Sequence, residues 1–144
     1  MNSPAYDMAI VLEAAGLGSL DLGTLLPGAG VGLAVGEEPP EPSEMITLYS
    51  YGGTAEEGIS LNCSPLDSFR MQVRVRARSY GAAYAMIQQV EDKLNMLKNH
   101  SVKDGTRTVW YTVTYRLQPP MENGFDERKR FIFTQNYAGL RQRI

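Results

Sequence analysis

Residues 69–98, FRMQVRVRARSYGAAYAMIQQVEDKLNMLK, change their hydrophobic period halfway along, and this change indicates the fold class. In the first ten residues apolar and polar side chains alternate strictly, which is typical of a strand with one buried and one wet face. The apolar set is Phe69, Met71, Val73, Val75 and Ala77. Ser79 suits a helix N-cap, and apolar residues then recur at helical spacing over about 80–98. The stretch therefore predicts a long strand that leads directly into a helix.

Weaker patterns on both sides of this stretch predict the other elements. Ser3-Pro4 is typical of a helix start, so a helix is expected over 4–15 before two nearby glycines. Four further strands are expected, at 31–35, from Met45 to the glycines at 52–53, at 107–117 and at 128–137. The piece at 31–35 is weakened by its glycines.

These elements indicate a single α+β domain over residues 1–144. Its sheet is expected to be mostly antiparallel or mixed, with four to five strands and two helices packed on one face. Residues 16–44 form a Gly/Pro-rich acidic loop within it, closed by Pro39, Pro40 and Pro42. At 43% hydrophobic and 21% charged residues, a chain of 144 residues buries about two thirds of its unfolded surface.

The small net charge of −2 conceals a split along the chain. Residues 1–69 contain ten acidic residues and no Lys or Arg, a formal charge of −10. Residues 70–144 contain all 14 basic and six acidic residues, a charge of +8. Such asymmetry indicates a polyelectrolyte partner or complementary protein surfaces, which lie either within one subunit or between neighbouring copies.

The groups needed for catalysis are scarce in this sequence. His100 is the only histidine and Cys63 the only cysteine, so one chain cannot build a two-histidine or Cys-rich metal site. The glycines at 28–32 match neither the P-loop nor the G-x-G-x-x-G pattern. We therefore expect no enzyme activity, no cofactor and no metal site, with His100 as a solvated surface residue and Cys63 as a free thiol.

The N-terminus carries no basic segment of the kind that begins a secretory signal, and no apolar run is long enough to span a membrane. A protein made in the cytoplasm, with no membrane partner, is expected.

Charged residues on the long strand and in two loops are the candidate contact residues. An arginine face such as that at 74–78 is a solvated surface in the simplest interpretation and a contact for acidic protein or phosphate in the functional one. Nucleic-acid sheets interleave stacking aromatics with basic residues, and this face has none, so protein recognition is favoured. The candidates are Arg74, Arg76, Arg78, Glu37, Glu38, Glu41, Arg128 and Arg130.

Several short motifs follow one another along the chain, namely ITLYSYGG (46–53), SYGAAYAMIQQVEDKLNML (79–97), RLQPP (116–120), NGFDERKR (123–130) and RFIFTQNY (130–137). Their order resembles that in the small phage minor capsid and tail-terminator proteins. The resemblance implies a non-enzymatic virion protein of the tail or neck that forms a homohexameric ring. Such a ring caps the tail-tube protein and docks to a neck or head-completion protein, and DNA is only passing cargo.

Two alternatives remain open from the sequence. One is a head-completion or adaptor protein of the neck, which would bind the portal side instead of the tail tube. The other is a nucleic-acid-binding module that uses the basic strand and whose affinity would fall steeply with salt.

Overall fold

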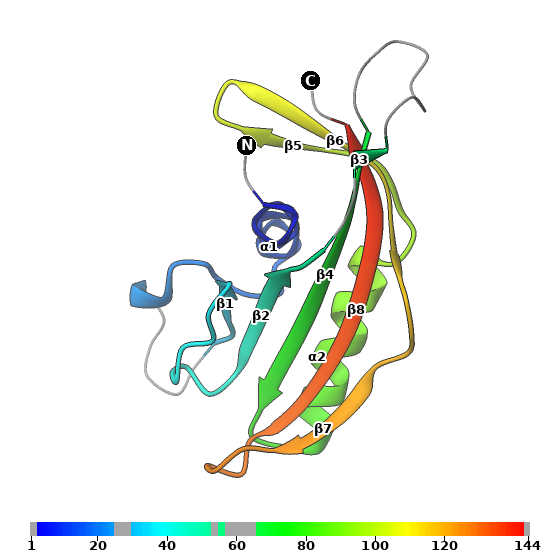
Figure 1. Cartoon of the computed structure of the whole chain (residues 1–144). Coiled ribbons are helices and arrows are strands. Elements are labelled where there is room, and N and C mark those ends of the chain that lie inside the picture. Colours follow the sequence, from blue (N-terminus) through cyan, green and yellow to red (C-terminus); the bar gives the residue numbers. More distant parts are fainter. Residues whose placement is uncertain (1–2, 25–29, 53–54, 57–65, 143–144) are drawn as a thin grey trace.

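The computed structural model describes residues 3–24, 30–52, 55–56 and 66–142, which form one curled sheet with two helices (Figure 1). The elements are α1 (Pro4–Ala14), the 3-10 helix η1 (Leu22–Thr24), β1 (Gly32–Val35), β2 (Met45–Ser50), β3 (Ala55–Glu56), β4 (Leu66–Ala77), α2 (Tyr80–Leu94), β5 (Leu97–Asp104), β6 (Arg107–Arg116), β7 (Met121–Phe125) and β8 (Phe131–Gln142). The expected α+β class is confirmed.

The sheet has the strand order β1-β2-β4-β8-β6-β5, with β3 beside β4 and β7 beside β8. β1 and β2 are parallel and the other pairs are antiparallel, so the expected mixed, mostly antiparallel sheet is confirmed. The expected count of four to five strands is wrong, because the described residues form eight. The sequence prediction lacks β3, β5 and β7, whose residues show no apolar alternation.

Both helices start at the predicted serine caps. The Ser3 hydroxyl accepts a hydrogen bond from the Tyr6 amide at 3.2 Å, and Pro4 occupies the first helical position. The Ser79 hydroxyl accepts from the Ala82 amide at 3.2 Å. Each cap satisfies one amide that has no partner inside its helix.

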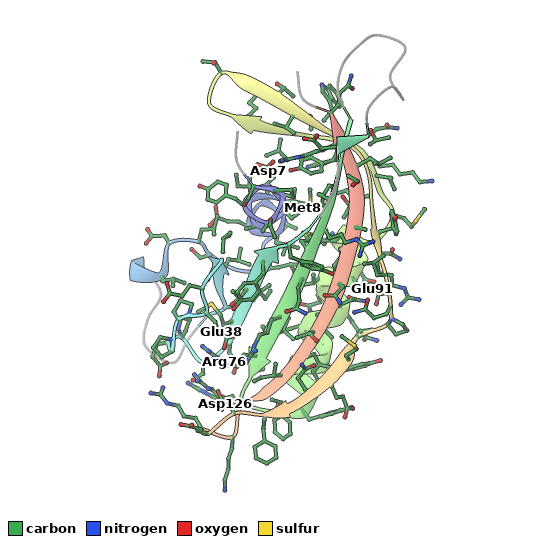
Figure 2. The ribbon with its side chains drawn as sticks, in the orientation of Figure 1. Asp7, Met8, Glu38, Arg76, Glu91 and Asp126 are labelled. Carbon is green, nitrogen blue, oxygen red and sulfur yellow. The ribbon has the colours of Figure 1, made fainter. Side chains whose placement is uncertain are left out.

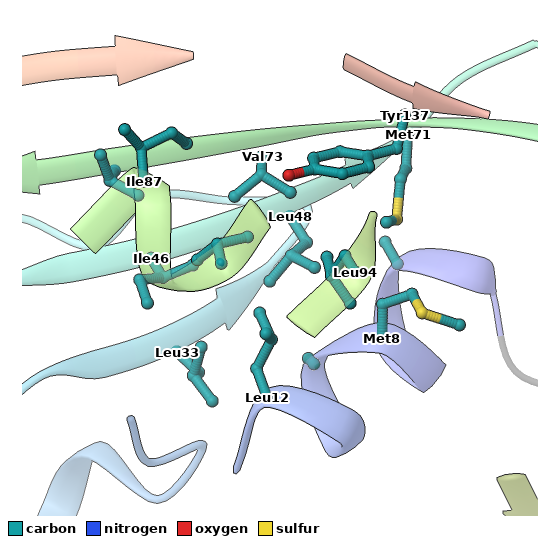
Figure 3. Close-up of a cluster of buried hydrophobic side chains, with 14 of the residues drawn as sticks. Met8, Leu12, Leu33, Ile46, Leu48, Met71, Val73, Ile87, Leu94 and Tyr137 are labelled. Atoms are coloured by element: carbon teal, nitrogen blue, oxygen red, sulfur yellow. The ribbon is translucent and has the colours of Figure 1, made fainter. Parts of the chain in front are cut away.

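The two helices pack on the same face of the sheet and share one hydrophobic core (Figure 3). Met8 and Leu12 of α1 meet Leu94 of α2 over the centre of the sheet. The apolar side of β4 is fully buried there, as its alternation predicts. Burying one large apolar side chain stabilises the fold by about 1.5–3 kcal/mol, so this cluster fixes both helices on the sheet.

The second helix ends earlier than its apolar stripe predicts. α2 stops at Leu94, and Met96 adopts a φ of 59° before the chain enters β5. Leu97, predicted on the helix stripe, begins that strand instead. The expected helix to residue 98 is therefore wrong at its end, because the backbone becomes extended at the C-cap Asn95 and left-handed at Met96.

The strand β6 contains a bulge that reverses its predicted alternation. Its pairing with β8 shifts between Tyr111 and Val113. Strict alternation along the strand predicted at 107–117 would bury Tyr115 on the same face as Val109 and Tyr111 and would expose Thr114. Beyond the shift the reverse holds, because Thr114 is fully buried and Tyr115 is 39% exposed. A bulge adds one residue to one strand and so exchanges the two faces.

Candidate functional site

The candidate site is built around a loop that covers the outer face of the sheet, opposite the helices. We call residues 36–44, which join the parallel strands β1 and β2, the acidic strap. Parallel neighbours need a crossover because the chain must return along the length of the strand. Here the crossover is the strap, and it returns over side chains of β4 that lie on the outer face.

Arg76 on the outer face of β4 binds the side of the strap that faces the sheet. Its guanidinium donates to the carbonyl oxygens of Ser43 at 3.2 Å, Pro39 at 2.9 Å and Pro42 at 2.7 Å, and to Glu38 Oε1 at 3.0 Å. The residue is only 1% exposed, although the strand pattern predicts a wet face. The expectation of a solvated face is therefore wrong at Arg76, because a segment more than 30 residues away in sequence covers it.

Arg130 binds the other side of the strap. Its Nη1 donates to the Pro40 carbonyl at 2.6 Å, and its Nε donates to Asp126 Oδ2 at 2.8 Å. Asp126 also accepts from the backbone amides of Arg128 and Arg130 at 2.9 Å each. One carboxylate thus fixes the turn between β7 and β8 and aims the arginine at the strap.

Two further ion pairs lie at the edges of this contact. Arg74 Nε lies 3.0 Å from Glu38 Oε2, and Arg128 Nη1 donates to Glu41 Oε1 at 2.8 Å. The Arg128 pair is well exposed, and such surface pairs contribute about 0–1 kcal/mol. We call the four arginines Arg74, Arg76, Arg128 and Arg130 the arginine clasp.

The chemistry of the strap matches that of the clasp. Proline has no backbone N–H, so Pro39, Pro40 and Pro42 each present a carbonyl acceptor and no donor. A guanidinium has five donors and no acceptor, and its planar fork reaches several oxygens at once. Arg76 and the strap therefore satisfy each other in a way that a lysine in its place could not reproduce.

Burial and hydrogen bonding shift two pKa values in the clasp. Burial lowers the pKa of Arg76, and the nearby Glu38 carboxylate opposes that shift. For Asp126, partial burial raises the pKa, but hydrogen bonds from Arg130 and Arg128 outweigh it and hold the pKa below its usual range. Asp126 is therefore ionised at neutral pH, as its part in the clasp requires.

The structure brings most of the eight predicted contact residues together, and Figure 2 shows Glu38 and Arg76 of this group beside Asp126. Six of them meet in the strap and the clasp, namely Arg74, Arg76, Arg128, Arg130, Glu38 and Glu41. The other two are exposed: Glu37 lies on the strap, and Arg78 follows β4, where its backbone amide donates to Glu44 at 3.3 Å. The acidic first half and the basic second half of the chain thus pair their charges within one subunit.

The sequence reasoning overlooked Asp126 and an aromatic cluster beside the clasp. Tyr80 contacts Phe131 and Phe133 with ring centroids 6.0 and 5.3 Å apart, and Phe125 lies 6.0 Å from Phe131. Tyr84 stacks on Tyr80, whose hydroxyl donates to Glu122. Tyr80 and Phe125 remain 47% and 65% exposed. The aromatic residues are visible in the sequence, but between the strands predicted at 107–117 and 128–137 it shows no strand pattern, so it does not reveal β7, which places Phe125 against Phe131.

A second buried polar contact lies at the far end of the sheet. The Tyr111 hydroxyl donates to Asp7 of α1, and both side chains are 0% exposed. Burial, followed by the bond to Asp7, raises the pKa of Tyr111, so the phenol stays neutral and acts as a donor. This bond ties the first helix to β6.

The predicted non-catalytic residues are placed as follows. His100 is half-buried in the strand β5, so it is not the solvated surface residue that the sequence predicts. Cys63 and residues 28–29 of the glycine segment lie outside the described residues. Among the residues that are described, no group of three His, Cys, Asp or Glu side chains could hold a metal ion, and no helix could span a bilayer.

The fold and site define a small α+β protein with a curled mixed sheet and a strap fixed by charged side chains. A family model described as "Bacteriophage tail terminator protein" matches residues 12–139. The chain belongs to the bacteriophage tail terminator family, as its motif order predicts, and is a structural protein of the virion.

A solved structure supports the same fold. It is described as "Virion of native gene transfer agent (GTA) particle", and one of its chains is 13% identical to this one with a TM-score of 0.62. The match covers 98% of this chain and 96% of that chain. No curated protein matches the sequence.

Proposed function

We propose that this protein is a tail terminator that forms a homohexameric ring at the head-to-tail junction, caps the tail tube and docks to the neck. The observation that carries the proposal is membership of the tail terminator family over 12–139. Its partners are then other copies of itself, the tail-tube protein and a neck or head-completion protein. DNA passes through the ring as cargo, and the protein resides in the neck of the virion.

The exposed aromatic cluster supports an assembled state. Tyr80, Tyr84 and Phe125 are between 41% and 65% exposed beside the carboxylate of Glu122. Exposed apolar patches with polar rims mark protein contacts, and Tyr, Phe and Met are enriched in interface cores. In a closed ring each copy presents two different patches, and this cluster is a suitable first patch.

The strap supplies the charged part of the proposed contact. Arg76 and Arg130 are buried and bind the strap, so their role is to hold it in one position. Glu37, Glu41 and Arg78 remain exposed around it and are the side chains that a neighbouring copy would meet. Preorganisation of the strap removes part of the ordering cost of that contact.

Solution mass and electron microscopy test the ring. We expect a species of six 15.9 kDa subunits, either free or on addition of purified tail tubes, and a ring on one tube end. Replacing both Phe125 and Tyr80 with glutamate should abolish the ring, while circular dichroism should show that the subunit is still folded. The matched control is Asp92→Lys on the exposed side of α2, which should assemble normally. A strict monomer that also fails to bind tubes would refute the proposal.

The partner assay separates the terminator from a head-completion or adaptor protein. A terminator pulls down tail tubes, whereas an adaptor binds the portal side. The nucleic-acid alternative gains no support from the clasp, since Glu38 and Glu41 already pair with three of its arginines and leave fewer free charges for phosphate.

A further inference from the structure

A groove on the outer face of the sheet lies beyond the strap and has no part in the clasp. Its centre is Ala138 of β8, which pairs with Arg70 of β4 on one side and with Tyr115 of β6 on the other. Cross-strand partners share one face of the sheet, so a small residue stands between two long ones. The result is a groove of about 320 Å³ that runs along β8.

The two walls of the groove differ in chemistry. Tyr115 and Leu117 form an apolar wall and are 39% and 43% exposed. The opposite wall carries the exposed guanidinium of Arg70, and Leu140 continues the floor beyond Ala138. An extended chain with an apolar side chain facing the floor could therefore present a neighbouring carboxylate to Arg70.

The same face already binds a segment of this kind. Arg70, Arg74 and Arg76 lie on one side of β4 at alternating positions, and the last two hold the acidic strap through Glu38 and backbone carbonyls. The strap occupies the Arg74–Arg76 end of this row. Arg70 and the groove form the other end, where an exposed arginine offers the same positive charge.

We propose that this outer groove binds an extended acidic segment of another protein, with Arg70 pairing to a carboxylate and Ala138 receiving an apolar side chain. The inference rests on the proposed function only for the origin of the segment, which would be a neighbouring virion protein. Phosphate backbones are a poorer fit, because Glu38 already neutralises the arginines next to Arg70 on the strand.

A peptide titration tests the groove on the full-length protein. The probe is an eight-residue peptide of alternating glutamate and leucine, and its matched control has glutamine in place of glutamate. We expect the acidic peptide to shift the backbone amide resonances of Ala138 and Leu140 and to bind about tenfold more tightly than the neutral peptide, because a charged hydrogen bond is lost in the latter.

Two variants assign the contact to its walls. Arg70→Gln should reduce affinity for the acidic peptide about tenfold and leave the neutral peptide unchanged. Ala138→Leu should fill the floor and weaken both peptides, whereas Arg78→Gln, an exposed arginine that follows the same strand, should weaken neither. Retained amide dispersion in each spectrum shows that the variant is folded.

The proposal is overturned by equal binding of the two peptides, by shifts confined to other strands, or by tighter binding of an oligothymidylate than of the acidic peptide at the same resonances. These outcomes are separate from ring formation, which is measured without any peptide. A hexamer whose groove ignores the probe refutes only the groove, and a monomer that binds the probe refutes only the ring.

Discussion

Replacing Arg76 with methionine should release the acidic strap from the sheet. The change keeps an unbranched apolar stem and removes every donor that binds three strap carbonyls and Glu38. Removing one partner of a buried ion pair costs about 3–5 kcal/mol. The strap lies at the surface, so water reaches its carbonyls once it lifts, and we expect a smaller loss of about 2–4 kcal/mol in the free energy of unfolding.

Urea denaturation followed by circular dichroism at pH 7 measures this loss. With a denaturant slope of about 2 kcal/mol per molar, the midpoint should fall by about 1–2 M. Amide hydrogen exchange provides the second readout, because backbone amides of the strap should exchange faster in the variant while those of β4 change less. Arg78→Met is the matched control, and it should stay within about 0.5 kcal/mol of the parent protein.

A double-mutant cycle with Glu38→Gln isolates the ion pair from the carbonyl contacts. If Arg76 acts mainly through Glu38, the two losses will be far from additive, and if it acts mainly through carbonyls they will nearly add. The four distances favour the second result, since three of the four acceptors are carbonyls. An unchanged midpoint together with unchanged exchange in the strap would refute the clasp as a stabilising contact.

The remaining predictions concern single positions. Gly139→Ala should destabilise the protein by about 3 kcal/mol, because the new Cβ would lie 2.2 Å from a carbonyl oxygen of β6. Gly81→Ala in α2 places its Cβ in open space and should stabilise the protein by about 0.5 kcal/mol, and thermal melts of the two variants compare these effects. Tyr111→Phe should cost about 1–3 kcal/mol in urea denaturation by withdrawing the donor to buried Asp7. Asp126→Asn should lose stability at pH 7, because the lowered folded pKa of Asp126 stabilises the folded state fully above the unfolded value near 3.8. The loss should shrink as the pH falls below 3.8 and through the folded pKa, and urea denaturation that gives a constant loss over this acidic range would contradict the assignment.

The sequence predicted those elements whose burial follows a simple period. The alternation over 69–77 and the helical spacing after Ser79 both reflect direct packing against one core, and β4 and α2 appear where expected. The serine caps act within four residues, so they too were readable. Each of these features depends on local geometry and on one buried face.

The elements that the sequence did not reveal lie at the edges of the sheet. All five residues of β7 are exposed, and β5 has a left-handed residue at Asn99, so neither strand has a continuous buried face. Edge strands of this kind are polar and irregular, which also protects them from pairing with other chains. These strands form because their backbones hydrogen-bond to a neighbouring strand, and the periodicity of side chains in the sequence does not report backbone pairing.

The buried state of Arg76 was hidden for a different reason. The alternation of β4 correctly placed it on the face away from the helices, but its exposure depends on a strap that returns over that face from residues 36–44. From the sequence, the prolines and glutamates of the strap predict only an acidic loop. The proline carbonyls of the strap act as hydrogen-bond acceptors for Arg76 and Arg130, and only the folded structure shows that these arginines lie within reach.

The charge split along the sequence follows from this arrangement. A crossover of nine residues between two parallel strands has no helix to satisfy its backbone, so its carbonyls need donors from outside the segment. Arginines on β4 and at the start of β8 supply them, and the acidic residues of the strap offset the charge that those arginines bring under it. The acidic first half of the chain therefore supplies the strap, and the basic second half supplies the arginines of the strands on which the strap packs. The acidic and basic side chains that stay exposed around the strap are the ones that a neighbouring subunit would contact in the proposed ring.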